Sequence, residues 1–198
     1  MEYIDVNSLK ELPSLNNNYR YLDFLGGTKQ YRCYVVPKEL PRCLFIENNR
    51  DKLDEILLPI YIDEHICISQ DSSYALPAFY IISLRKHYKS ITELTYELYE
   101  KINFWVYEIR KAMKEALKIE YVNIYYEEKT SESANVHYWL MPVMTKENIA
   151  PKLHYLFLKD YLEQFKLIEN RNQIKEYNEK MRKYIYENKI PEKFKMKG

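Results

Sequence analysis

Apolar residues recur every three or four positions between residues 94 and 117, and a helix start signal precedes them. Ser90 lies three residues before Glu93, the arrangement of a capping box, which satisfies free amides at a helix start. The pattern predicts a helix of about seven turns with one continuous buried stripe. That stripe consists of Leu94, Leu98, Ile102, Trp105, Ile109, Met113 and Leu117.

Segments on both sides of this helix have the composition of strands. Residues 60–69 and 78–84 are apolar runs separated by the turn-prone stretch 70–77, and together they predict a hairpin. After the helix, residues 121–127 and 135–143 predict two further strands. The order of elements indicates an α+β fold with an antiparallel sheet and a long helix across it.

The front of the chain is harder to interpret. Residues 31–36 and 42–47 are short apolar runs close to prolines, and we expect both to be strands. The length of 198 residues suits one domain with a sizeable core. We therefore expect one domain over residues 1–145, with an N-terminal extension, and a helical appendage over residues 146–198.

The appendage is predicted from two amphipathic patterns. The first stripe contains Leu153, Leu156, Phe157, Tyr161 and Phe165, and the second contains Ile174, Tyr177, Met181 and Tyr184. Each pattern has helical spacing, and the faces between the apolar positions are charged. These helices are expected to pack on the core or on a second subunit.

Charge and cysteine content exclude several classes of protein. A formal net charge of +1, from 30 basic and 29 acidic residues, gives no strong signal for nucleic acid or an anionic membrane as the main partner. The three cysteines, Cys33, Cys43 and Cys67, lack metal-ligand spacing and indicate reduced structural thiols. The longest apolar stretch, residues 56–62, is far shorter than the roughly 18 residues that span a bilayer. With no signal-peptide pattern at residues 1–12, we expect a soluble, cytoplasmic protein.

The last predicted strand carries one histidine. Strand alternation places three residues on one face of the sheet: Val136, Tyr138 and Leu140. It places four on the other: Asn135, His137, Trp139 and Met141. A single histidine in such a strand is usually a satisfied structural residue, so the strand alone does not assign a function to His137.

The order of elements over residues 60–143 resembles the histidine-triad (HIT) superfamily of nucleotide hydrolases and transferases. In many members the last core strand carries His-x-His-x-His-x-x-Pro. Here Asn135, His137, Trp139 and Pro142 stand at those four places. The histidine that is retained, His137, matches the middle one, which is the nucleophile of the family.

A second match lies upstream, in the stretch DSSYALPAFYIISLRKH. It resembles the family segment of aspartate, loop, proline, apolar strand and basic-basic-histidine, with Asp71, Pro77, Lys86 and His87 in register. The resemblance implies that Asp71 holds the ribose hydroxyls of a nucleotide. Asn123 stands close to the place of a family asparagine that lines the site.

The resemblance also implies the chemistry. In the family an imidazole attacks the α-phosphorus of a nucleotide and forms a nucleotidyl-histidine, which water or another acceptor then resolves. The attacking nitrogen must be unprotonated, and a backbone carbonyl on the strand accepts a hydrogen bond from the other ring nitrogen. His137 could keep this function without neighbouring histidines.

The sequence departs from the family at three histidine positions, which are occupied by Phe79, Asn135 and Trp139. Asn135 can donate to a phosphate oxygen and Trp139 has one indole N–H, whereas Phe79 offers nothing polar. None of the three can shuttle a proton as histidine does. In the turn before the last strand, Ser131 and Ser133 are possible phosphate contacts through their hydroxyls.

Each assignment has a structural alternative. Asp71 could cap its own turn, because aspartate commonly bonds to nearby backbone amides. Asn123 could be ordinary strand-edge polarity, and Trp139 could be a packing residue that also stacks on a base. Lys86 and His87 are expected to be surface or structural residues.

Three functional hypotheses follow. The first is a divergent HIT-like nucleotide hydrolase or nucleotidyltransferase, with His137 as nucleophile and a nucleotide or nucleoside phosphate as partner. The second is a catalytically inactive HIT-fold protein that binds nucleotides or assists assembly. The third is a helical interaction module that uses residues 151–188. The resemblance implies a homodimer, and the sequence indicates neither a cofactor nor a metal.

Overall fold

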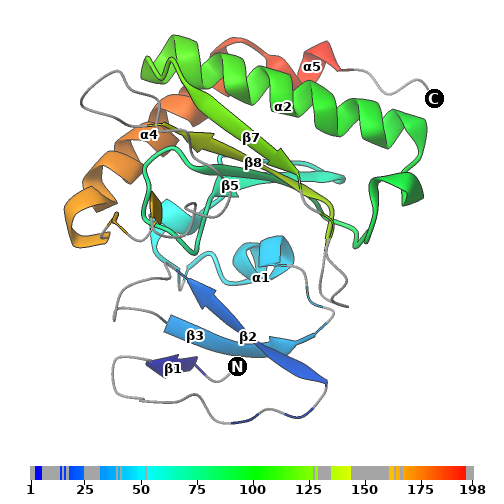
Figure 1. The fold of residues 1–198 in the computed structure, drawn as a ribbon, viewed down its shortest axis with the longest axis vertical. Helices are drawn as coiled ribbons and strands as arrows, with labels where there is room; N and C mark the ends of the chain where they lie inside the picture. Colours follow the sequence, from blue (N-terminus) through cyan, green and yellow to red (C-terminus); the bar gives the residue numbers. More distant parts are fainter. Residues whose placement is uncertain are drawn as a thin grey trace.

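The computed structural model describes most of the core of the chain. The described residues are 3–5, 14, 16, 18–24, 32–38, 40, 42–51, 53–126, 128, 135–143, 161–162, 164–165 and 167–194. They form two antiparallel sheets with helices packed around them (Figure 1). The predicted α+β fold with an antiparallel sheet and a long helix is confirmed.

The larger sheet has five strands in the order β4-β5-β6-β8-β7, all antiparallel to their neighbours. The strands are β4 (Tyr61–Ile62), β5 (Ile66–Gln70), β6 (Tyr80–Leu84), β7 (Val122–Tyr126) and β8 (His137–Pro142). The hairpin and the two later strands are therefore confirmed. The stretch predicted as one strand over 60–69 is instead two strands, because Asp63 Oδ1 accepts the amides of His65 and Ile66 and closes a tight turn.

The long helix, α2 (Tyr96–Leu117), lies across one face of this sheet (Figure 1). Its predicted stripe from Leu98 to Leu117 is buried against the sheet. The predicted start at Ser90 is wrong. Ser90 caps a short 3-10 turn, η3 (Ile91–Glu93), and Leu94 is extended, so the α-helix begins only after the Thr95 cap.

The C-terminal helix α4 (Leu167–Glu187) packs beside α2 and is followed by α5 (Ile190–Lys193). Met181 and Ile185 of α4 are buried in the same cluster as the α2 stripe. The second predicted amphipathic helix is thus present, and its apolar side is occupied within the chain. Most of the first predicted stripe lies outside the described residues, and the division at residue 146 stays a prediction.

The N-terminal part forms a separate three-stranded sheet. Its strands β1 (Tyr3–Asp5), β2 (Tyr19–Phe24) and β3 (Arg32–Pro37) pair in the order β1-β3-β2. Helix α1 (Arg42–Asn48) lies between this sheet and the five-stranded one (Figure 1). β3 agrees with the strand predicted at 31–36.

The strand predicted at 42–47 is wrong, since these residues are helical in α1. Cys43, Ile46 and Asn49 are buried at a spacing of three, which a helix places on one side. Asn49 Nδ2 donates to the Phe45 carbonyl at 2.8 Å and satisfies a free acceptor near the helix end. The run was too short for its periodicity to separate helix from strand.

No helix among the described residues is long and apolar enough to cross a bilayer.

Candidate functional site

His137 begins β8 in the interior of the five-stranded sheet. It pairs with Ser83 of β6, which in turn pairs with Cys67 of β5. Residues directly opposite in neighbouring strands share a face, so these three side chains form one row. Val136 and Leu140 pack into the cluster beneath α2, so the half-buried His137 lies on the other face. The predicted alternation along this strand is confirmed.

A hydrogen bond fixes the orientation of the His137 ring. Its Nδ1 lies 2.6 Å from the backbone carbonyl oxygen of Asn135. A carbonyl oxygen can only accept, so Nδ1 carries the hydrogen in this bond. When the ring is neutral, the lone pair is therefore on Nε2, the state that a nucleophilic imidazole requires.

Both ends of the Asn135 side chain are engaged by backbone groups. Its Nδ2 donates to the Leu84 carbonyl at 2.8 Å, and its Oδ1 accepts the Tyr88 amide at 2.9 Å. These contacts join the end of β6 to the residues just before β8. The side chain thus has a structural role that the sequence reasoning did not anticipate, beside the predicted contact with a phosphate.

Asp71 follows β5 and is buried, with 4% of its surface exposed. Its Oδ1 accepts the amides of Ser73 and Tyr74 at 2.7 and 2.8 Å. These bonds form the turn cap that was predicted as the alternative to ribose binding. They involve one of the two carboxylate oxygens of Asp71. Its ribose role stays a prediction.

The loop after Asp71 is also contacted by α1. The Arg42 guanidinium donates to Ser72 Oγ and, at 3.4 Å, to Ser73 Oγ. This places a cation beside the loop that the resemblance assigns to the nucleotide. Arg42 was missed because it belongs to the segment predicted as a strand, and no motif marked it.

Two of the replaced histidine positions form an aromatic pair. Phe79 is buried, and its ring meets the Trp139 ring edge to face at 6.1 Å between centroids. Their cluster also contains Leu76, Met141 and Leu162. Packing thus accounts for both aromatic side chains. Trp139 also lies beside His137, with 5.5 Å between ring centroids.

Asn123 lies on β7 opposite Met141, on the same face of the sheet as His137 and Trp139. Its side chain is hydrogen-bonded to Tyr125. Burial raises the pKa of the Tyr125 hydroxyl, although this hydrogen bond acts in the opposite direction. The structure therefore brings three predicted site residues onto one face, while Ser131 and Ser133 lie outside the described residues.

Lys86 and His87, which we expect to be surface or structural residues, and His65, which belongs to no motif, have the following surroundings. His65 Nε2 lies 3.1 Å from Glu64 Oε1, near the β4–β5 edge. Lys86 Nζ stands over the Tyr88 ring at 5.4 Å. His87 Nε2 is buried with no hydrogen-bond partner within the described ranges.

Cys43 and Cys67 are both buried and free, and their side chains are hydrogen-bonded to each other. That bond, together with burial, raises the pKa of the Cys67 thiol. In the part of the chain that the structure describes, no group of three or more His, Cys, Asp or Glu side chains could hold a metal ion.

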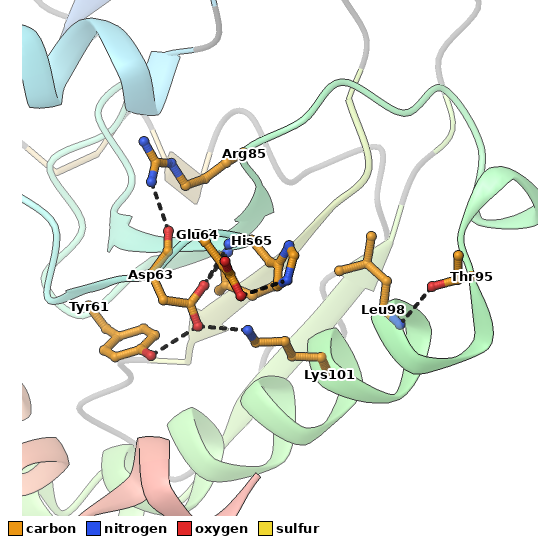
Figure 2. Close-up of polar contacts among 9 residues, drawn as sticks. Tyr61, Asp63, Glu64, His65, Arg85, Thr95, Leu98 and Lys101 are labelled. Carbon is orange, nitrogen blue, oxygen red and sulfur yellow. Dashed lines mark hydrogen bonds and ion pairs between the residues drawn. The ribbon is translucent and has the colours of Figure 1, made fainter. Parts of the chain in front are cut away.

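A polar network at the other edge of the sheet was missed entirely by the sequence reasoning. Figure 2 shows Asp63 between Tyr61, Arg85 and Lys101. Asp63 Oδ2 lies 2.9 Å from Lys101 Nζ and accepts the Tyr61 hydroxyl at 3.0 Å, while Arg85 Nη1 donates to the Asp63 carbonyl at 2.9 Å. The signal in the sequence was a lysine within the buried stripe of α2, three residues after Leu98.

Burial would raise the pKa of Asp63, but the Lys101 ammonium and the amides of Ile66 and His65 outweigh it. The pKa is therefore lowered. Arg85 Nη2 also lies 2.5 Å from Glu47 Oε2 of α1. We treat this network as a structural feature rather than as part of the candidate site, because Tyr61 and Asp63 lie at the β4 side of the sheet, with β5 and β6 between them and β8.

Solved structures provide the comparison with known proteins. A hypothetical histidine triad nucleotide-binding protein from Sulfolobus tokodaii superposes with a TM-score of 0.50 at 17% identity, over 73% of this chain and 91% of that one. A Hit-like protein involved in cell-cycle regulation from Bartonella henselae matches at a TM-score of 0.44 and 17% identity, over 70% and 93%. No protein-family model matches the sequence, and the search of curated proteins found no match.

Proposed function

Because the chain has the fold of the histidine-triad proteins, we propose that it is a divergent nucleotide hydrolase or nucleotidyltransferase with His137 as its nucleophile. The observation that carries the proposal is the 2.6 Å bond between His137 Nδ1 and the Asn135 carbonyl. It places the hydrogen on Nδ1 and therefore the lone pair of the neutral ring on Nε2, the nitrogen that would attack. The nucleotide-binding description of the Sulfolobus protein supports a nucleotide or nucleoside phosphate as the ligand.

In the proposed reaction, His137 Nε2 attacks the α-phosphorus of the nucleotide. The new N–P bond forms as the P–O or P–N bond to the leaving group breaks, and the leaving group departs with the electron pair. Water or another acceptor then attacks the phosphorus and releases the imidazole. The two steps are each easier than a direct displacement, which is the advantage of a covalent intermediate.

The aromatic pair limits the choice of leaving group. Phe79 and Trp139 stand where the family has imidazoles, and neither can deliver a proton to a departing oxygen or nitrogen. Loss of a general acid typically costs about 10² to 10⁴ in rate. The proposed substrates therefore have leaving groups that are stable without protonation, such as pyrophosphate or an acidic phenol.

The other predicted residues would bind the substrate. Asp71 would hold the ribose hydroxyls while its Oδ1 keeps the turn closed, and Trp139 would stack on a base. Asn123 would line the site, and Ser131 and Ser133 would donate to the phosphate. Asn135 would approach the phosphate with the second hydrogen of its Nδ2, since the first donates to the Leu84 carbonyl.

Mass spectrometry after incubation with nucleoside triphosphates, dinucleoside polyphosphates and nitrophenyl esters of nucleoside monophosphates tests the proposal, and nucleoside phosphoramidates, whose amine leaving group needs a proton, should react more slowly. We expect a nucleoside-monophosphate adduct on His137, and loss of both adduct and turnover in His137→Ala. His65→Ala is the matched control, because His65 directly precedes β5, which is two strands away from β8, and this variant should keep both. Absence of adduct and turnover across the whole panel would refute the assignment.

An inactive nucleotide-binding or assembly protein is the second candidate. It is favoured by Phe79, which has 1% of its surface exposed and fills its position with an apolar ring. This candidate predicts that AMP shifts NMR resonances of residues around His137 and that no substrate turns over. Turnover that depends on His137 would eliminate it. The homodimer implied by the resemblance is a separate proposal, to be measured by analytical ultracentrifugation.

A further inference from the structure

The ladder between β6 and β8 is interrupted next to the candidate nucleophile. Ser83 and His137 are the last paired residues of the two strands, and Leu84 N still reaches the Val136 carbonyl at 3.4 Å. The chain then leaves β8, since Arg85 N donates to the His65 carbonyl instead. It returns at Tyr88, whose carbonyl accepts Val136 N at 2.8 Å.

The interruption brings a backbone acceptor, Leu84 O, and a backbone donor, Tyr88 N, to the Asn135 side chain. Its amide donates to the first at 2.8 Å and accepts from the second at 2.9 Å. A primary amide offers the same donor and acceptor as a peptide unit, so it can take the place of the missing strand contacts. Without the Asn135 side chain, both backbone groups would be partly buried and would lack these hydrogen bonds, which costs free energy.

We propose that Asn135 is a positioning residue, whose side-chain bridge fixes the backbone carbonyl that selects the Nδ1–H tautomer of His137. The same residue is anchored through its amide on one side and accepts the imidazole Nδ1 through its carbonyl at 2.6 Å on the other. A bridge of this kind restricts rotation of the Asn135 backbone, and hence movement of the carbonyl. The catalytic consequence rests on the proposed function, but the tautomer does not.

NMR of the protein labelled with ¹⁵N-histidine reads the tautomer directly, at a pH where the ring is neutral. In the wild type we expect the hydrogen on Nδ1 and the lone pair on Nε2 of His137. In Asn135→Ala we expect a mixture of tautomers and faster hydrogen exchange at the Tyr88 amide. A change in folding alone would not select one ring nitrogen, so the tautomer separates positioning from a merely structural role.

Two variants keep the test interpretable. Asn135→Asp retains an acceptor for Tyr88 N and loses the donor to Leu84 O. We expect this variant to fold and to show a tautomer mixture intermediate between the wild type and Asn135→Ala. It therefore replaces Asn135→Ala in the test should the alanine variant fail to fold. Asn188→Ala is the matched control, because its amide donates to the Tyr184 carbonyl at 2.9 Å on the exposed end of α4. It should leave the His137 tautomer unchanged.

If substrate turns over, Asn135→Ala should lower kcat by about 10- to 100-fold with little change in KM, as expected when a reacting group is misplaced. An Nε2–H tautomer in the wild type, or one unchanged tautomer in all variants, overturns the inference. A tautomer shift in the Asn135 variants of a protein that turns over no substrate supports the positioning and counts only against the proposed function.

Discussion

The carboxylate of Asp63 joins three segments of the chain at one edge of the sheet. It accepts amides within its own turn, the Tyr61 hydroxyl beside it and the Lys101 ammonium from α2 (Figure 2). The Lys101 side chain is only 10% exposed. Removing one partner of an ion pair this buried lowers the stability of the fold, because the other charge is left without its counter-ion in a place that water hydrates poorly.

We predict that Lys101→Ala lowers the free energy of unfolding by about 3 kcal/mol, the lower end for breaking a buried pair, since Asp63 keeps its other donors. Urea denaturation measures the change. The control is Lys111→Ala, whose exposed partner Glu115 lies 3.9 Å away, and it should change stability by about 0.5 kcal/mol or less. Equal effects of the two substitutions would mean that the Asp63 pair is not buried in solution.

The lowered pKa of Asp63 also predicts a dependence of stability on pH. Its folded pKa lies below the value of about 3.9 for an unfolded aspartate. The stabilisation is thus complete above the unfolded pKa and is lost as the pH falls through the folded pKa. Urea denaturation between neutral pH and acid should show this loss in the wild type, and a smaller acid-dependent loss in Asp63→Asn.

At the level of single residues, the sequence predicted which face of the sheet a side chain lies on, but not which groups it contacts. Alternation along β8 was enough to place His137 and Trp139 on one face, because a strand has a period of two. The bridge from Asn135 to Leu84 and Tyr88 could not be predicted, since it depends on where β6 leaves the ladder. The same holds for Asp63 and Lys101, which meet only after the sheet and helix pack.

At the level of elements, long periodic patterns were reliable and short ones were not. The stripe of α2 repeats over six turns, so its existence and buried face were clear, although Leu94 broke the pattern before the helix began. The seven residues of α1 give fewer than two full repeats, and their apolar content favoured a strand. The N-terminal sheet lacked alternation strong enough to predict its pairing.

Packing of α4 on the core leads to a prediction for that helix. Met181 is fully buried in the same cluster as the stripe of α2, so Met181→Ala should cost about 3 kcal/mol of stability through the cavity that it leaves. Tyr186 on the same helix is 84% exposed, and Tyr186→Ala should change stability by about 0.5 kcal/mol or less. Thermal unfolding compares the two. A negligible effect at Met181 would indicate that residues beyond 146 form an independent unit.

Across the whole molecule, polar contacts connect helices that lie on opposite faces of the sheet. Glu47 of α1 binds Arg85, Arg85 binds the Asp63 backbone, and Asp63 binds Lys101 of α2. This chain of contacts passes around the β4–β5 edge, whereas the candidate site lies towards β8 and β7. The buried ion pair and the residues of the proposed chemistry therefore lie in different parts of the same sheet. Variants at Lys101 should consequently leave formation of the His137 adduct intact.

The neighbours of β8 are distant in sequence, and this predicts an order of folding. The bond from Asn135 to Leu84 spans 51 residues, whereas α2 is built from contacts four residues apart. Closing a long loop costs more entropy than local helix formation, so it comes later. Pulse-labelling hydrogen exchange during refolding should protect amides of α2 before that of Tyr88. Protection of Tyr88 first would contradict this order.

In a partly folded chain, with the helix and the β5–β6 hairpin in place, the bridge from Asn135 to Leu84 and Tyr88 would be absent, and the proposed positioning predicts that the Asn135 carbonyl would not be held towards His137. Its imidazole would exchange tautomers as a free histidine does in water. Under the proposed positioning, the Nδ1–H form of His137 would be fixed only when the last long-range pairing closes. Nascent or damaged molecules would therefore lack the proposed reactivity towards nucleotides, and competence to form the adduct would serve as a measure of complete folding.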